Sequence, residues 1–161
     1  MKKALLIVGL LIIIAAAVIG VMVWKEFSKF MAMEVIKVDP QLTVFIGGSG
    51  NSFVLASEDG KQALAVDTKM RGAAREMRDA VKAEEIIVVN THSHSDHAAG
   101  NALYPKAKII AGSYEKNEWD EASDKSRYPD ITLKPGEEKE LKIGKETVII
   151  RNMGRAHTTN D

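Results

Sequence analysis

The residues of this chain best suited to chemistry are gathered in one short segment, residues 92–97, which reads HSHSDH. Three of the four histidines of the chain lie in this segment, and the fourth is His157. Random placement of histidine and aspartate at this composition would produce the pattern with a probability on the order of 10⁻⁴. Imidazole and carboxylate groups placed this densely indicate a metal site.

The spacing within the segment separates two groups of candidate ligands. An unbroken apolar run, Ile86–Val89, directly precedes it and indicates a buried strand. If the chain leaves this strand in an extended form, His92 and His94 point to the same side and can share one metal ion. Asp96 and His97 follow in the turn and can serve a second ion nearby. Because the chain contains no cysteine, its donors suit Zn²⁺ best and also accept Fe or Mn.

Short apolar runs separated by turns predict the sheet that must position these side chains. Strands are predicted at residues 35–38, 42–46, 52–56, 63–67, 86–89, 108–111, 131–133, 140–143 and 147–151. Apolar residues at helical spacing predict an amphipathic helix over 71–83, and a second, short helix is predicted over 98–104. Antiparallel strands, then a helix, then a buried strand indicate an α/β (α+β) domain with a mixed sheet and helices packed on it.

Two glycine-containing segments predict hairpin connections in this sheet. Asp59-Gly60 lies between two β-rich runs and is typical of a tight hairpin turn. Gly47–Gly50 is also flanked by strand-like runs, and no Gly-Lys-Ser/Thr follows it. The glycines at 47–50 are therefore expected to form a flexible hairpin loop and not a phosphate-binding cradle.

A separate apolar segment occupies the N-terminus. Ala4–Trp24 contains no charged residue, and as a helix it would reach roughly 31 Å, enough to cross a bilayer. The apolar region of a cleaved signal peptide typically spans about 7–15 residues. The greater length of this segment therefore favours an uncleaved signal anchor over a signal peptide cleaved near Ala15-Ala16-Ala17. Lys2 and Lys3 favour a cytoplasmic N-terminus and an extracytoplasmic domain, whereas cleavage would give a secreted protein.

Charge and segment boundaries define what the remainder can contact. The predicted organisation is an anchor at 1–24, a linker at 25–34 and one domain at 35–161. The chain has 22 basic and 22 acidic residues, so it carries no general positive field and nucleic acid is not an expected partner. The expected partners are a membrane, through residues 4–24, and a small-molecule substrate.

Residues 92–97 resemble the signature of the metallo-β-lactamase-fold hydrolase superfamily. Val66-Asp67-Thr68, at the end of an early strand, is similar to the first motif of that superfamily, and Gly154-Arg-Ala-His157-Thr158 is similar to its third. The resemblance covers most of residues 35–161. It implies an αββα sandwich, present here mainly as its first half and preceded by a transmembrane helix. The signature is specific for the superfamily and says little about the substrate.

The resemblance also implies a role for each matched residue. Asp67 would brace the ligand loop by hydrogen bonding, a role compatible with capping the turn that follows it. Thr158 would support the backbone of its loop. The implied ligands of two zinc ions are His92, His94 and His157 for the first, and Asp96 and His97 for the second.

The end of the sequence departs from the pattern of the superfamily. The chain ends at Asp161, shortly after His157. In the superfamily a second half supplies a later aspartate, which bridges both metal ions, and a last histidine for the second ion. The domain at 35–161 is therefore expected to be incomplete at its C-terminus, part of a longer protein, and inactive by itself.

Three functions remain open on this basis. The first is a zinc-dependent hydrolase in which a metal-bound hydroxide attacks a carbonyl or phosphoryl centre and Asp96 is the catalytic residue that holds it and takes its proton. Its substrate could be a β-lactam, ester, thioester, lactone or phosphoester. The second is an iron-dependent persulfide oxidoreductase of the same fold, and the third is a non-catalytic, membrane-tethered fragment. Tyr114, Trp119 and Tyr128 are better explained by packing than by a substrate groove.

Overall fold

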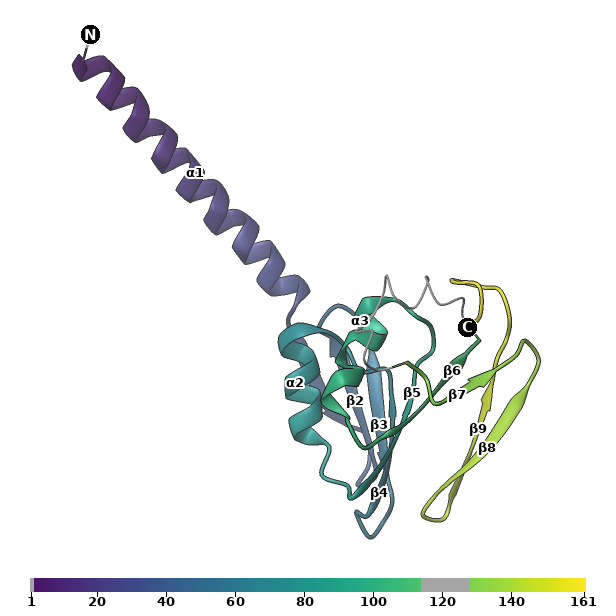
Figure 1. Ribbon diagram of the computed structural model, residues 1–161. Coiled ribbons are helices and arrows are strands. Elements are labelled where there is room, and N and C mark those ends of the chain that lie inside the picture. The colour runs from purple at the N-terminus through teal and green to yellow at the C-terminus, as the bar shows by residue number, and fades with distance from the viewer. Residues whose placement is uncertain (1, 114–127) are drawn as a thin grey trace. The chain divides into compact units, whose positions relative to one another are not determined.

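The computed structural model describes residues 2–113 and 128–161, and the chain divides into two compact units, Met1–Ala32 and Met33–Asp161. The first unit is a single helix, α1 (Lys2–Phe30), drawn in purple in Figure 1. Its segment Leu6–Phe30 has a mean hydropathy of 3.2 in its most apolar stretch. By length and composition this segment can cross a membrane, as the sequence predicts, and a signal sequence has the same properties.

Helix α1 is longer than the apolar segment predicted at 4–24. It continues beyond Trp24 to Phe30, so most of the predicted linker at 25–34 is helical. These residues include neither proline nor glycine, the two residue types that most disfavour a helix. The ammonium of Lys29 lies 2.8 Å from the carboxylate of Glu26 one turn earlier, a pairing that supports the helix.

The second unit is built on a mixed seven-stranded sheet, which confirms the predicted α/β class. Its strands lie in chain order and run antiparallel from β1 to β4 and parallel from β4 to β7. They are β1 (Met33–Lys37), β2 (Leu42–Gly47), β3 (Ser52–Ala56), β4 (Gln62–Val66), β5 (Glu85–Val89), β6 (Lys108–Gly112) and β7 (Ile131–Leu133). A separate antiparallel hairpin consists of β8 (Glu138–Ile143) and β9 (Glu146–Arg151). The hairpin turns predicted at 47–50 and 59–60 join β2 to β3 and β3 to β4.

The helices of this unit differ from the predicted ones at their ends. Helix α2 (Arg71–Ala80) ends before the predicted residue 83, because Val81 has an extended backbone (φ −84°, ψ 111°) and its amide donates to the carbonyl of Arg78. Val81 still packs in the core. The helix predicted at 98–104 is replaced by α3 (Ser95–Ala98) followed by the 3-10 helix η1 (Ala99–Leu103). Asp96 and His97, predicted to lie in a turn, therefore lie in α3.

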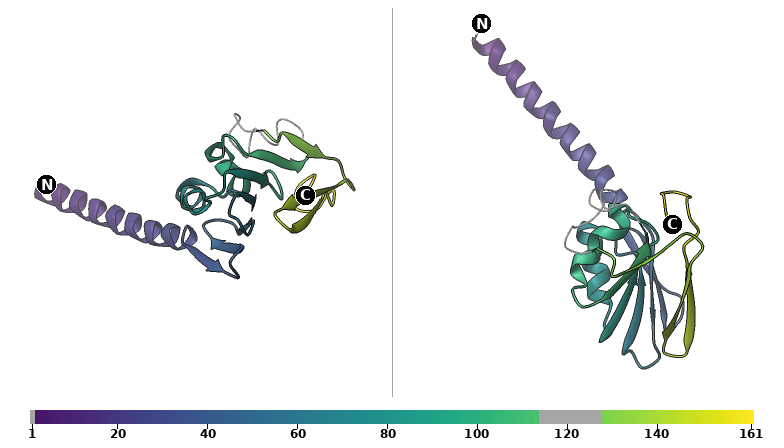
Figure 2. Two further views of the ribbon diagram at one scale, coloured as in Figure 1. Left: turned by 90° about the horizontal axis from the view of Figure 1, so that it is seen from below. Right: turned by 45° about the vertical axis from the view of Figure 1, so that its right-hand side comes forward.

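Two apolar cores pack on the opposite faces of the sheet. Helices α2, α3 and η1 cover one face, and the β8–β9 hairpin, drawn in yellow-green, lies against the other (Figure 2). The core on the helical face contains Phe45, Val54, Ala63, Ala65, Met77, Val81, Val88, Tyr104, Ala107 and Ile109. The core under the hairpin contains Leu64, Val89, Ile110, Leu133, Leu141 and Ile143. This order of layers, helix, sheet and second sheet, is the arrangement predicted for the first half of an αββα sandwich.

The register of the two central parallel strands places the candidate site at one edge of the sheet. Val66, the last residue of β4, is paired with Val89, the last residue of β5. The loops that follow therefore start side by side, and the amide of Asp67 donates to the carbonyl of Val89 at 2.8 Å. The carboxyl ends of parallel strands are the usual position of binding sites in sheets of this type.

Candidate metal centre

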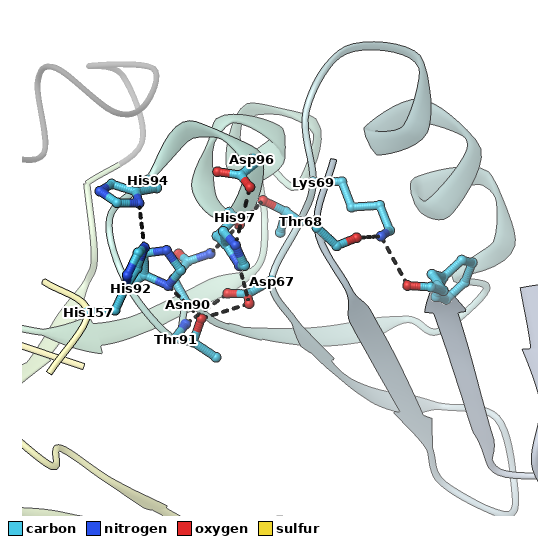
Figure 3. A network of polar contacts seen from close by, with 12 residues as sticks. Asp67, Thr68, Lys69, Asn90, Thr91, His92, His94, Asp96, His97 and His157 are labelled. Atoms are coloured by element: carbon cyan, nitrogen blue, oxygen red, sulfur yellow. Dashed lines mark hydrogen bonds and ion pairs between the residues drawn. The ribbon is translucent and has the colours of Figure 1, made fainter. Parts of the chain in front are cut away.

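Three histidines converge, two from the loop that follows β5 and the third from the distant loop that follows β9 (Figure 3). The ligand atoms of His92, His94 and His157 all lie within 4.8 Å of one another, and these residues could hold a metal ion. Nε2 of His157 is 3.2 Å from Nδ1 of His94. The ring centroids of His92 and His94 are 4.8 Å apart, although the chain bends at residues 91–93 and does not leave β5 in the extended form assumed for them.

The remaining two candidate ligands lie beside this group. The ring centroids of His92 and His97 are 4.0 Å apart. Nε2 of His97 is also 3.4 Å from a carboxylate oxygen of Asp96, so both groups face the same space. The structure thus brings together all five residues that the sequence singles out as ligands.

A closed loop after β9 presents His157. The amide of Met153 donates to the carbonyl of Asp161 at 2.7 Å, and the amide of Asp161 donates to the carbonyl of Gly154 at 3.0 Å. The carboxylate of Asp161 then accepts hydrogen bonds from the amides of His157 and Thr158 and from the hydroxyl of Thr158. Burial raises the pKa of Asp161, but the hydrogen bonds from Thr158 and His157 outweigh it and lower that pKa overall. Asp161 and Thr158 therefore fix the backbone that carries this histidine.

Asp67 is buried at the base of the centre and sets the protonation of His97. Its carboxylate accepts from the amide and the hydroxyl of Thr91, both at 2.8 Å, and lies 2.7 Å from Nδ1 of His97. A carboxylate can only accept, so Nδ1 of His97 must carry the proton and donate it. The lone pair of Nε2 is thereby left free on the side that faces Asp96. These hydrogen bonds join Asp67 to the segment that contains the candidate ligands.

The same reasoning extends through Thr91 to His92. The single hydroxyl hydrogen of Thr91 is donated to Asp67, so its oxygen must accept from Nδ1 of His92, 3.0 Å away. Nε2 of His92 is then also left with a free lone pair. This nitrogen is buried and has no hydrogen-bond partner within the part of the chain that the structure describes. An orphaned buried acceptor among imidazoles is the donor chemistry that suits a zinc ion.

Burial and neighbouring charges shift the pKa values of His92 and His97 in opposite directions. Burial lowers the pKa of His92, and the nearby His97 lowers it further, which keeps the ring neutral. Burial also acts to lower the pKa of His97, but its hydrogen bond with Asp67 and the charges of Asp67 and Asp96 outweigh this effect and raise the pKa. A metal ligand must be a neutral imidazole, so protons compete with a metal more strongly at His97 than at His92.

A network of buried amide side chains supports the backbone of α3, and this network was not predicted from the sequence. The side chain of Asn90 donates to the carbonyl of His97 at 2.9 Å and accepts from that of Asn101 at 2.8 Å. The hydroxyl of Thr68 lies 2.8 Å from Oδ1 of Asn101. A sequence signal exists, because Asn90 directly follows an apolar strand and Asn101 interrupts a run of small and apolar residues. Polar residues in such positions are buried only when they are hydrogen-bonded.

Of the three aromatic residues predicted to serve packing, only one can be placed. Tyr114 and Trp119 lie outside the described residues. Tyr128 is half-buried and packs against Ala98 and Ala111, as predicted.

Comparison with known proteins agrees with this arrangement. The family model of the metallo-beta-lactamase superfamily matches residues 46–157, which include every candidate ligand, and the chain belongs to this hydrolase superfamily. No curated protein sequence matches the chain.

Several solved structures share the fold of this chain. BJP-1, a subclass B3 metallo-beta-lactamase of Bradyrhizobium japonicum, is 21% identical, with a TM-score of 0.62 over 83% of this chain and 56% of that one. A B3 metallo-beta-lactamase described as the first with an active-site glutamic acid is 17% identical, with a TM-score of 0.60 over 84% of this chain and 58% of that one. A metallo-beta-lactamase of Cronobacter sakazakii with a HARLDQ motif is 16% identical, with a TM-score of 0.52 over 73% and 50%. The chain therefore spans little more than half the length of these structures.

Proposed function

We propose that the protein is a zinc-dependent hydrolase whose metal centre is formed by the five candidate ligands. The observation that carries this proposal is the hydrogen-bond chain from Asp67, which leaves Nε2 of both His92 and His97 with a free lone pair. Such a chain orients imidazoles for metal binding and selects their tautomer. His94 and His157 complete the first set of three histidine ligands, the number usual at a catalytic zinc site.

In this proposal zinc, when bound, lowers the pKa of a water molecule toward neutrality and polarises the bond under attack. Asp96 is the proposed catalytic base. Its carboxylate is about one-third exposed and lies next to Nε2 of His97, so it can accept the proton that the attacking water loses. The substrate would be a β-lactam, ester, thioester, lactone or phosphoester, since each presents an electrophilic carbonyl or phosphoryl centre to such a water molecule.

The test combines metal binding with turnover. The longer parent protein expected from the sequence, purified in detergent micelles, is titrated with zinc by calorimetry and assayed against a chromogenic β-lactam, an aryl ester, a thioester, a lactone and a phosphodiester, with residues 1–161 alone in parallel. Asp96→Asn should lower kcat by at least about hundredfold with little change in KM, whereas Asp79→Asn, an exposed carboxylate on α2, should change neither. Equal turnover in the two variants would exclude Asp96 as the base.

The other outcomes separate the remaining functions. Co-purified iron together with persulfide oxidation would replace the hydrolase by the oxidoreductase. Zinc binding without turnover of any substrate would agree with the non-catalytic function, and with the expectation that residues 35–161 are inactive by themselves. Failure of the chain to bind zinc at all would overturn the proposal.

We further propose that α1 remains attached as a membrane anchor, with the second unit outside the cytoplasm. The supporting observation is an uninterrupted apolar helix, of which Leu6–Phe30 is long enough to span a bilayer. Alkaline carbonate extraction of membranes from expressing cells should leave the protein in the pellet. Release of a soluble product with a new N-terminus near Val18 would instead indicate a cleaved signal and a secreted protein.

A further inference from the structure

The turn between β2 and β3 is packed against the candidate metal centre. A methyl group placed on Gly50 would lie 3.3 Å from Nε2 of His97 and 3.5 Å from the carbonyl oxygen of Asp96. A methyl group placed on Gly48, at the other side of the turn, would lie 2.7 Å from Cβ of Ala73 in α2. The turn therefore borders the metal-facing nitrogen of His97, and its position decides how much space that nitrogen has.

The turn itself has a composition that favours mobility. Gly47, Gly48 and Ser49 are three consecutive residues with left-handed φ angles, of 81°, 65° and 80°. Glycines lose more conformational entropy on folding than other residues, so a segment rich in them is expensive to order. Within the turn, the amide of Gly47 donates to the side chain of Asn51 at 3.0 Å. A further constraint must come from outside the turn.

Lys69 provides that constraint. Its ammonium donates to the carbonyls of Phe45, Gly47 and Gly50, at 3.1, 2.7 and 2.5 Å. An ammonium has three N–H donors, so these bonds use all of them. The side chain is fully buried and is directed toward β2, away from the histidines (Figure 3).

Two features of Lys69 are unfavourable by themselves, which indicates that its contacts matter. Its φ angle of 58° lies in the left-handed region, which residues other than glycine rarely adopt. Burial also lowers its pKa to about 8, yet the ammonium remains the main form at neutral pH. Strain and buried charge persist only where the surrounding structure compensates them. The carbonyl of Lys69 also accepts from the amide of Gly100 at 2.8 Å, so this residue joins the turn to η1, which directly follows α3.

We propose that Lys69 is a positioning residue that holds Gly50 beside His97 and so keeps the ring of His97 directed at the space shared with Asp96. The inference rests on the proposed function, because it assigns Lys69 a role toward a metal ion bound by these two ligands. A zinc ion must approach Nε2 to about 2.0–2.1 Å, so a Cβ atom at residue 50 would intrude on its surroundings. Glycine at residue 50 and lysine at residue 69 therefore act together.

Hydrogen exchange in the metal-free chain tests whether Lys69 holds the turn between β2 and β3, independently of any metal ion. The full chain in detergent micelles is compared with Lys69→Met, whose unbranched side chain is one atom shorter and has no donor, and with Lys82→Met, which removes an exposed charge. Exchange of the amides in residues 45–53 should be at least roughly tenfold faster in Lys69→Met, because three carbonyls lose a charged donor. Exchange at the wild-type rate would overturn the proposal.

Cobalt titration of the same variants in the longer parent protein, which is expected to supply the remaining ligands of the second ion, tests the effect on the metal centre, because Co²⁺ absorbs visible light and reports each binding step. In Lys69→Met the first equivalent should bind as in the wild type and the second roughly tenfold more weakly. Gly50→Ala keeps Lys69 and should weaken binding of the second cobalt equivalent similarly, while the amides of residues 45–53 exchange at the wild-type rate. If Lys69→Met does not fold, Gly50→Ala provides the test of whether the space beside His97 controls the second binding step. Equal binding of both equivalents in all variants would refute the inference and leave the proposed function intact. A wild-type chain that takes up no cobalt would refute the proposed function, while the exchange result still tests Lys69.

Discussion

Replacing Asp67 with asparagine should reverse the hydrogen bonds that prepare the histidines. The oxygen of the new amide must remain at the amide of Thr91, which donates to Asp67 at 2.8 Å, and this places the NH₂ group at the former position of Oδ2. In the wild-type chain, Oδ2 of Asp67 accepts from Nδ1 of His97 and from the hydroxyl of Thr91, at 2.7 and 2.8 Å. Because NH₂ donates, both partners must accept instead. The protons then move to the metal-facing Nε2 atoms of His97 and, through Thr91, of His92.

The loss of zinc affinity in Asp67→Asn can be estimated from the cost of returning His97 to its native tautomer. Zinc can bind the variant only if His97 returns to its native tautomer, which leaves its Nδ1–H facing another N–H. Loss of a hydrogen bond to a charged group costs about 1.5–3 kcal/mol, which corresponds to roughly ten- to hundredfold in affinity. His92 is one bond further from residue 67 and is one of three ligands, so the first zinc should lose less than the second. The backbone adds little, because asparagine tolerates the φ angle of 60° at this residue.

Calorimetric zinc titration measures the affinities, and long-range nitrogen–proton NMR of ¹⁵N-histidine identifies the tautomers. Asp59→Asn is the matched control, since Asp59 is an exposed carboxylate that also accepts hydrogen bonds in a turn. Thr91→Val removes only the hydroxyl link, so it should weaken the first zinc and leave the tautomer of His97 unchanged. Zinc affinities of Asp67→Asn equal to those of Asp59→Asn, or an Nδ1–H tautomer at both rings in Asp67→Asn, would refute the reasoning.

Three further predictions concern the ligands and the packing of the centre. His157→Ala should weaken the first zinc at least about hundredfold by calorimetry, whereas Arg155→Ala, an exposed neighbour, should not; equal affinities would remove His157 from the ligand set. Acidification from about pH 8 to 5 should release the second zinc before the first, because a protonated imidazole cannot bind a metal. The pKa of His97 is raised above 6.5, whereas that of His92 is lowered below it. Dialysis followed by metal analysis measures the order of release, and the reverse order would contradict the prediction. Gly100→Ala should destabilise the fold by about 1–3 kcal/mol in urea unfolding, because its Cβ would lie 2.1 Å from the carbonyl oxygen of Thr68, whereas Gly72→Ala on the exposed side of α2 should stabilise it by up to about 1 kcal/mol.

The positions of the central ligands could be predicted because they depend on strand ends. The apolar run Ile86–Val89 locates the end of β5, and parallel pairing with β4 then brings Asp67 beside the histidine segment. Both steps use a regular periodicity that local sequence determines. His92 and His94 come together through bends at residues 91–93, which alternation along an extended chain does not predict.

The supporting contacts could not be predicted, because they depend on tertiary packing at single residues. Helix α3 contains four residues, too few to show an apolar period, so the sequence predicts a turn at Asp96 and His97. Lys69 has the composition of a surface residue, and only the folded structure reveals that it is buried against three carbonyls. The extent of α1 beyond Trp24 differs from these cases, because residues 25–30 contain no helix-ending residue, a signal that is present in the sequence but that hydropathy does not report.

The contacts of residues 67–69 place the organisation of the centre in a segment that contributes no candidate ligand. Asp67 sets the tautomers of two histidines, Thr68 donates its amide to the carbonyl of His97 at 2.7 Å, and Lys69 holds the turn that borders the same ring. Asp67 and Lys69 both have left-handed backbones, of 60° and 58°, which turns consecutive side chains toward different parts of the site. Each left-handed residue costs on the order of 1 kcal/mol or more, and the hydrogen bonds that it makes possible offset that cost. Loss of metal binding should therefore follow substitutions at 67–69 as well as at the histidines, since the histidines supply the nitrogen atoms and this segment decides which of them are free to bind.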